Sequence, residues 1–109
     1  MIEHYSFGRI IIDGKVYTSD VLIVGNTTHS WWRNQGHVLA PEDLDLIIKE
    51  NPQTLVVGIG ASGLMKIPEK TVQFIKDHNI ILIAEKTKKA VETFNTLTGT
   101  KAAALHLTC

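Results

Sequence analysis

Residues 55–63 read LVVGIGASG, and this stretch decides how the rest of the chain is interpreted. Its branched apolar residues predict a buried strand over residues 54–59, and a G-x-G-x-x-G pattern formed by Gly58, Gly60 and Gly63 overlaps the end of that strand. A phosphate-binding loop and a sharp turn at the end of a sheet strand can both produce this pattern. The distance to the next helix separates the two interpretations.

That distance argues against a dinucleotide-binding loop. In dinucleotide-binding domains the helix begins inside the glycine run, so that its first amides contact the pyrophosphate. Here the helix-start signal is Pro68, several residues later, and too few residues follow Glu85, the candidate ribose-binding acid, for a second nucleotide-binding half. We therefore expect no bound cofactor, and we interpret Gly58 and Gly60 as a sharp turn where side chains would obstruct a neighbour.

Strands and helices alternate after this stretch. The expected elements are helices over 68–78 and 87–97, the second capped by Thr87, and strands over 80–84 and 102–108. A strand–helix–strand–helix–strand order implies right-handed crossovers and a mainly parallel sheet. The continuously apolar strands, 54–59 and 80–84, are predicted to be covered on both faces.

The N-terminal part carries a hairpin signal. Asp13-Gly14 stands between two β-prone runs, residues 7–12 and 15–18, and this dipeptide favours a type I′ turn. Residues 21–24 predict a third strand. A β-hairpin layer in front of an α/β half is the architecture that this order favours.

A long connection separates the two parts. Residues 25–39 are rich in polar and aromatic side chains and are expected to be irregular. Pro41 then predicts the start of the first helix, and Asn51-Pro52 its end.

Composition describes an ordinary globular chain. It has 109 residues, 44% hydrophobic and 20% charged, which predicts one domain over residues 1–109. Eleven basic residues balance eleven acidic ones, which argues against nucleic acid as a partner. With Cys109 as the single cysteine, no intrachain disulfide is possible. Residues 1–4 show no signal-peptide pattern, and the longest apolar run, 80–84, is too short for a membrane span, so we expect a cytoplasmic protein.

One loop concentrates unusual side chains. Trp31, Trp32 and Arg33 bring both tryptophans and one of two arginines together, with His37 close behind. Tryptophan and arginine are typical of contact surfaces. The alternative is structural, with one tryptophan plugging the sheet against the first helix and Arg33 making an ion pair. His29 and His37 lack nearby ligands at metal-binding spacing, so no metal site is predicted.

Two further clusters favour structural interpretations. His106 and Cys109 suggest a dyad, but an extended strand would point them to opposite faces, so we expect His106 to be a hydrogen-bonded histidine at the end of the sheet. Lys86, Lys88 and Lys89 surround Thr87 at a helix start. They either flank an anion or form a solvated face.

The chain as a whole resembles one small family. Trp32-Arg33-x-x-Gly36-His37, the glycine-rich strand end, Pro68 before a helix and the final His106-x-Thr-Cys109 are similar to adipogenesis-associated Mth-domain-containing proteins. Relatives in that family include a mitochondrial assembly factor of respiratory complex I. The resemblance implies a three-layer α/β domain with a mixed, mostly parallel sheet, at least one of its central strands antiparallel. It implies no established enzymatic activity and no catalytic residue.

Function is therefore expected at the carboxyl ends of the central strands, where ligands usually enter open α/β sheets. The favoured hypothesis is a non-enzymatic binding or assembly module, which takes a protein partner or a small anionic ligand. The alternative is a small enzyme or sensor for an anionic metabolite. The residues expected at this site are Trp31, Trp32, Arg33, His37, Gly58, Gly60 and Thr87.

Overall fold

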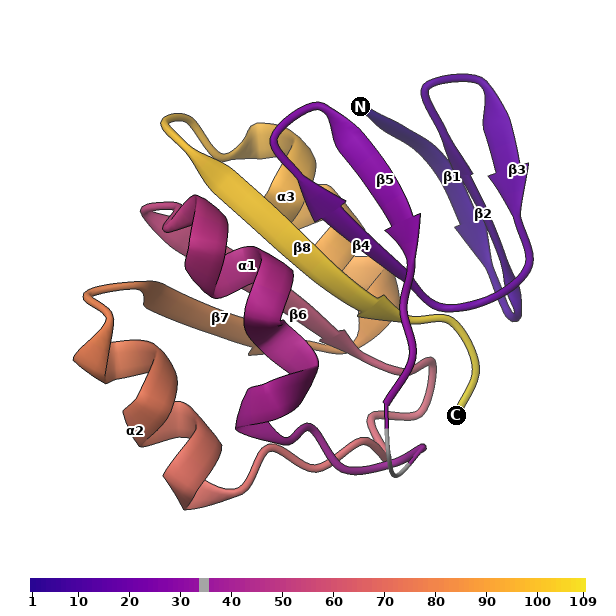
Figure 1. Ribbon diagram of the computed structural model, residues 1–109. Helices are drawn as coiled ribbons and strands as arrows, with labels where there is room; N and C mark the ends of the chain where they lie inside the picture. The colour runs from indigo at the N-terminus through magenta and orange to yellow at the C-terminus, as the bar shows by residue number, and fades with distance from the viewer. Residues whose placement is uncertain (34–35) are drawn as a thin grey trace.

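The computed structural model describes residues 1–33 and 36–109 (Figure 1). The elements in chain order are β1 (Ile2–Ser6), β2 (Arg9–Ile12), β3 (Lys15–Tyr17), β4 (Val21–Val24), β5 (Thr27–Ser30), the 3₁₀ turn η1 (Pro41–Leu44), α1 (Asp45–Glu50), β6 (Thr54–Ile59), α2 (Glu69–Asp77), β7 (Ile81–Glu85), α3 (Thr87–Thr96) and β8 (Lys101–His106). Within the described ranges, no helix is long and apolar enough to cross a membrane.

A five-stranded mixed sheet forms the centre of the fold. Its strand order is β5-β4-β8-β6-β7. β6 runs parallel to both β7 and β8, whereas β4 is antiparallel to β8 and β5. The predicted α/β class is confirmed, and β4 is the antiparallel central strand that the family resemblance implied.

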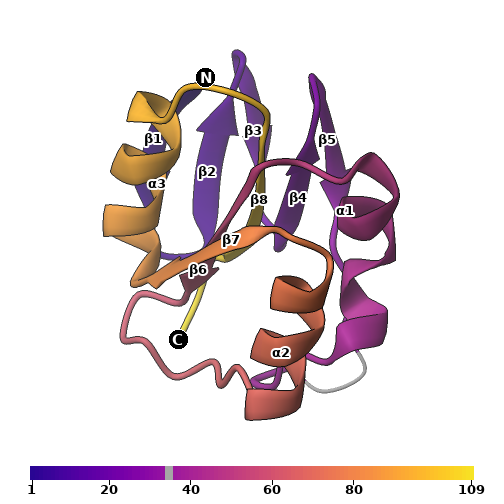
Figure 2. The same ribbon diagram turned by 90° about the vertical axis from the view of Figure 1, so that its left-hand side faces the viewer.

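Side-chain alternation along the strands creates two cores, one on each face of this sheet. Leu55 and Val57 of β6 pack with α1, α2 and Trp31, whereas Val56 between them packs with α3 and the hairpin strands. Figure 2 shows the resulting three layers, with α3 and the small β1-β2-β3 sheet on one side and α1 and α2 on the other. The predicted hairpin layer therefore shares its face of the sheet with α3.

The N-terminal hairpin has the predicted turn and one additional strand. Asp13 and Gly14 have φ angles of 49° and 82° and join β2 to β3, as a type I′ turn requires. The prediction of one strand over residues 7–12 was wrong at its start. Gly8, with φ 74°, reverses the chain so that β1 pairs antiparallel with β2.

Replacing Gly14 by valine is expected to lower the free energy of unfolding by about 1–3 kcal/mol, because a β-branched residue is strained at positive φ. A Cβ at Gly14 meets nothing within 4 Å, so the cost comes from the backbone alone. Urea unfolding measures the effect, with Gly36→Ala as the control because Gly36 also has open space around it and no such φ constraint. An unchanged urea midpoint for Gly14→Val would contradict this turn geometry.

Two strand predictions need correction. Residues 25–39 are not wholly irregular, since β5 lies within them and pairs with β4. The apolar run at β7 is not covered on both faces. β7 is an edge strand, and Ile81 is 62% exposed.

The helices begin close to the predicted signals. Pro41 starts η1, which leads into α1, and Asn51 ends α1 in the left-handed conformation with φ 50°. Pro68 directly precedes α2, as predicted. Thr87 is not the cap of α3, because Lys86 occupies that position and the Thr87 hydroxyl is engaged elsewhere.

Candidate functional site

Distant parts of the chain meet at the end of the sheet where β6, β7 and β8 finish. We call this end of the sheet, which differs from its outer strands, the carboxyl edge. Because β4 is antiparallel to β8, with Val21 opposite Leu105, the residue before β4 also lies at this edge. Val21 pairs in turn with Ser30, the last residue of β5. The edge therefore brings Asp20, the Trp31–Arg33 segment and His106 together.

Three of these residues form a buried charged group, the Asp20 cluster, consisting of Asp20, Arg33 and His106. Asp20 Oδ2 lies 2.7 Å from Arg33 Nη2 and 2.7 Å from His106 Nδ1, and Asp20 Oδ1 accepts a 2.7 Å hydrogen bond from the Leu107 amide. The side chains of Arg33 and His106 are only 4% and 6% exposed. The prediction that His106 is a hydrogen-bonded histidine at the end of the sheet is confirmed.

The cluster sets the ionisation of Asp20. Burial alone would raise the pKa of the Asp20 carboxyl, but hydrogen bonds from His106, the Leu107 amide and Arg33 outweigh it and hold that pKa below its ordinary value. Burial, and then the charge of Asp20, raise the pKa of the Tyr5 phenol. Asp20 is thus an anion at neutral pH, and Tyr5 is neutral.

The two tryptophans have different roles. Trp31 is buried in the core between the sheet and α1, and its Nε1 donates a 3.0 Å hydrogen bond to the Asp43 carbonyl in η1. The Arg33 guanidinium lies 4.4 Å from the centre of the Trp31 ring. Trp31 thus packs between the sheet and the first helix, and Arg33 makes an ion pair with Asp20. Trp32 is 87% exposed.

A pocket of about 300 Å³ opens beside these residues, and we call it the Trp32 pocket. It is lined by Ser19, Asp20, Ser30, Trp31, Trp32, Arg33 and Gly36. His37 is exposed, and its ring stands edge-on to His106 with 5.5 Å between centroids. The structure thus groups four of the predicted site residues, Trp31, Trp32, Arg33 and His37, near the Asp20 cluster.

Gly58, Gly60 and Thr87 form a separate, closed arrangement. The Gly60 amide donates a 2.9 Å hydrogen bond to Thr87 Oγ1, which donates in turn to the His106 carbonyl. A Cβ at Gly58 would lie 2.9 Å from Thr87 Oγ1, and one at Gly60 would overlap the backbone carbonyl of Cys109. What a side chain at Gly60 would obstruct is therefore the chain's own 108–109 segment.

Backbone amides of the glycine loop donate hydrogen bonds to carbonyl groups of the protein itself. Ala61 donates to the Thr108 carbonyl at 2.7 Å, Leu64 to that of Cys109 at 3.0 Å, and Met65 to that of Ile59 at 3.1 Å. Glu85, the candidate ribose-binding acid, accepts a 2.6 Å hydrogen bond from Thr93. A phosphate cradle needs free amides, and these are engaged.

Other predicted clusters stay separate. His29 lies in β5, and no group of three or more potential metal ligands occurs in the residues that the structure describes. Lys86, Lys88 and Lys89 are all exposed at the start of α3.

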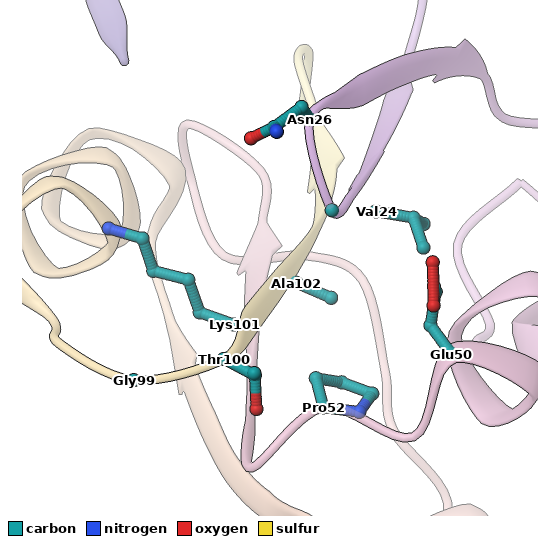
Figure 3. Close-up of a pocket in the computed structure, with 9 residues that line it drawn as sticks. Val24, Asn26, Glu50, Pro52, Gly99, Thr100, Lys101 and Ala102 are labelled. Carbon is teal, nitrogen blue, oxygen red and sulfur yellow. The ribbon is translucent and has the colours of Figure 1, made fainter.

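A second pocket, of about 290 Å³, lies at the opposite end of the sheet, where β8 begins (Figure 3). Glu50, Pro52 and Thr100 border it around Ala102. The Lys101 side chain turns away from this pocket and donates to the Phe94 and Leu97 carbonyls. Glu50 therefore supplies the one carboxylate among the residues that line this pocket.

Comparison with known proteins identifies the family of this chain. The model of a family described as "Protein of unknown function (DUF498/DUF598)" matches residues 2–106. The chain belongs to this family. A solved structure with a similar fold is that of conserved hypothetical protein PH1505 from Pyrococcus horikoshii OT3, with 26% identity, a TM-score of 0.87, and coverage of 100% of this chain and 99% of that one.

Two more solved structures share the fold at lower identity. An outer membrane protein from Bartonella henselae is 21% identical, with a TM-score of 0.86 over 99% of this chain and 94% of that one. A protein named MT938 is 21% identical, with a TM-score of 0.84 over 100% of this chain and 98% of that one. These two similarities show the fold of the DUF498 chain, and they assign no activity to it.

Proposed function

We propose that this chain is a non-enzymatic binding or assembly module that docks a protein partner at the carboxyl edge. The observation that carries the proposal is Trp32, whose large side chain is 87% exposed. Its neighbours on either side, Trp31 and Arg33, are both held in the protein. A rigidly mounted, exposed tryptophan is typical of an interface anchor.

Further exposed apolar side chains lie at the same edge. Phe7 is 63% exposed, and the adjacent Gly8 amide bonds to the Leu107 carbonyl at 2.9 Å. Leu64 is 51% exposed, and its amide bonds to the Cys109 carbonyl. Both residues therefore flank the segment that follows β8. Exposed apolar groups gathered at one edge favour a protein contact.

Each predicted site residue has a place in this proposal. Trp32 and the exposed His37 contact the partner, whereas Trp31 and Arg33 position Trp32. Gly58, Gly60 and Thr87 shape the glycine loop beside the 108–109 segment, and Leu64 projects from that loop.

Replacing Trp32 by alanine is expected to weaken partner binding by at least about tenfold, because a central tryptophan contributes 2 kcal/mol or more at many interfaces. Proteins captured from cells by the wild type are compared with those captured by Trp32→Ala. Any protein lost is then purified and titrated against both the wild type and Trp32→Ala by calorimetry.

The matched control is Ile81→Ala, which removes another exposed apolar side chain, 62% exposed, from the edge strand β7. It should bind like the wild type, and both variants should keep the wild-type unfolding midpoint. A purified partner that binds Trp32→Ala and the wild type equally would refute docking through this residue.

A second candidate function is the binding of a small anionic metabolite in the Trp32 pocket, by a sensor or a small enzyme. It is favoured by the buried guanidinium of Arg33, which lines that pocket. Titration of the wild type with small organic acids separates this function from docking, since it needs no partner protein.

The family resemblance and the location complete the proposal. We infer kinship with Mth-domain-containing proteins from the Trp32-Arg33 loop and the His106-x-Thr-Cys109 ending. We also propose a cytoplasmic location, which fits the single cysteine. Fractionation of cells that express the tagged chain tests the location.

A further inference from the structure

Two buried nitrogen atoms in the Asp20 cluster have no hydrogen-bond partner in the described part of the chain. They are Arg33 Nη1 and His106 Nε2. Both belong to side chains that are more than nine-tenths buried. Leaving a buried polar group unpaired costs about 1–3 kcal/mol, and more for a charged one. Two such atoms on neighbouring side chains can each take a further hydrogen bond.

The charge of the cluster indicates which kind of group suits these two nitrogen atoms. Asp20 already accepts hydrogen bonds from Arg33, His106 and the Leu107 amide, and its single negative charge balances Arg33. A protonated His106 therefore leaves one positive charge uncompensated. Of the titratable groups beside the cluster in the described residues, His37 stands edge-on to His106 and Tyr5 is neutral, and neither supplies an anion.

We propose that Arg33 Nη1 and His106 Nε2 form a subsite for the carboxylate of an aspartate or glutamate side chain on the docking protein, and that His106 takes up a proton as this carboxylate enters. The inference rests on the proposed function, since it names the polar contact beside Trp32. Arg33 and Asp20 line the Trp32 pocket, which gives the incoming side chain its route to the Arg33 side of the cluster.

The number of donors favours a carboxylate over a phosphate group. Arg33 Nη2 and Nε are occupied by Asp20 and the Gly36 carbonyl, so one guanidinium nitrogen and one ring nitrogen remain. A planar, singly charged carboxylate suits two donors. The negative charge of Asp20 also disfavours a dianion at such short range.

The surrounding charges fit an acidic protein segment. Lys66 donates its amide to the His37 carbonyl, and its side chain is exposed at this edge, as is that of Lys86 before α3. The chain as a whole carries eleven basic and eleven acidic residues, and this balance favours a protein segment over nucleic acid.

The test uses the wild-type protein and a pair of small probes, N-acetyl-aspartate N-methylamide and its asparagine counterpart. Histidine ring signals are followed by NMR during titration to about 50 mM probe, because a single carboxylate contact binds in the millimolar range. The aspartate probe should shift the His106 signals and leave those of the exposed His4 unchanged. The asparagine probe should shift neither.

Proton uptake gives the second readout. Binding of the aspartate probe should be tighter at pH 6 than at pH 8, because a ligand that binds together with a proton binds more tightly as the pH falls. Calorimetry in two buffers with different ionisation enthalpies should show uptake of a fraction of a proton for each probe bound. His106→Gln should abolish this pH dependence.

Three outcomes would overturn the subsite: unmoved His106 signals at the highest probe concentration, equal shifts with the asparagine probe, or binding of free acetate without binding of the aspartate probe. The last result would assign the site to a small organic acid. Loss of the subsite with intact Trp32-dependent docking removes only this inference. Docking that ignores Trp32→Ala removes the proposed function instead.

Discussion

Asp20→Ala is expected to lower the free energy of unfolding by about 3–5 kcal/mol, because it removes one partner of a buried ion pair and leaves the other charge uncompensated. Arg33 would lose its ion pair, His106 its hydrogen bond, and the Leu107 amide its acceptor. Urea unfolding at neutral pH measures the change.

The matched control is Asp13→Asn, because asparagine tolerates the positive φ of 49° at this turn position as aspartate does. Asp13 also makes an ion pair, but its side chain is 66% exposed. Exposed pairs contribute about 0–1 kcal/mol, so this variant should stay close to the wild type. Similar losses for Asp13→Asn and Asp20→Ala would contradict the assignment of the buried cluster as a stabilising centre.

The same residue predicts a pH dependence. The pKa of Asp20 is lowered in the folded protein, so its contribution to stability is fully present above the unfolded pKa of about 4 and is lost as pH falls through the folded value. The difference in unfolding free energy between the wild type and Asp20→Asn should therefore shrink below pH of about 4. A constant difference in acid would show that Asp20 titrates alike in both states.

Gly60→Ala is expected to lower the free energy of unfolding by about 3 kcal/mol or more. Its φ angle of 103° costs an L-residue about 1–3 kcal/mol. The new Cβ would also displace the Cys109 backbone and weaken the Ala61–Thr108 and Leu64–Cys109 hydrogen bonds, each contributing about 1 kcal/mol.

Gly14→Ala separates these two costs. Gly14 has a similar positive φ of 82°, but nothing lies within 4 Å of its Cβ position. It should therefore show the backbone cost alone and lose less stability than Gly60→Ala. Equal losses in urea unfolding would mean that the 108–109 segment moves aside freely.

Local signals account for the parts of the fold that the sequence predicted. The apolar run of β6, the Asp13-Gly14 turn and the prolines before η1 and α2 each act through their own backbone or nearest neighbours. β5 was missed because its sequence, TTHS, has no apolar alternation and takes its structure from pairing with β4. The exposure of β7 depends on strand order, which no local signal encodes.

The site was predictable only in part, for the same reason. Trp31 and Trp32 are identical neighbours, and only the path of the chain after β5 decides which of them is buried. The sequence around Asp20 did not indicate a buried ion pair, since a Ser-Asp pair before a strand is typical of a turn. Its role depends on Arg33 and on His106, which is 86 positions away.

The place of β8 in the sheet has a consequence for synthesis in the cell. β8 follows every other strand in sequence, yet it lies between β4 and β6 at the middle of the sheet. A ribosome that has made everything up to α3 has therefore produced two separate halves of a sheet, each with an open strand edge. Those edges are competent to pair with other chains until β8 emerges and closes the gap. We expect nascent chains that stall before β8 to need chaperone protection.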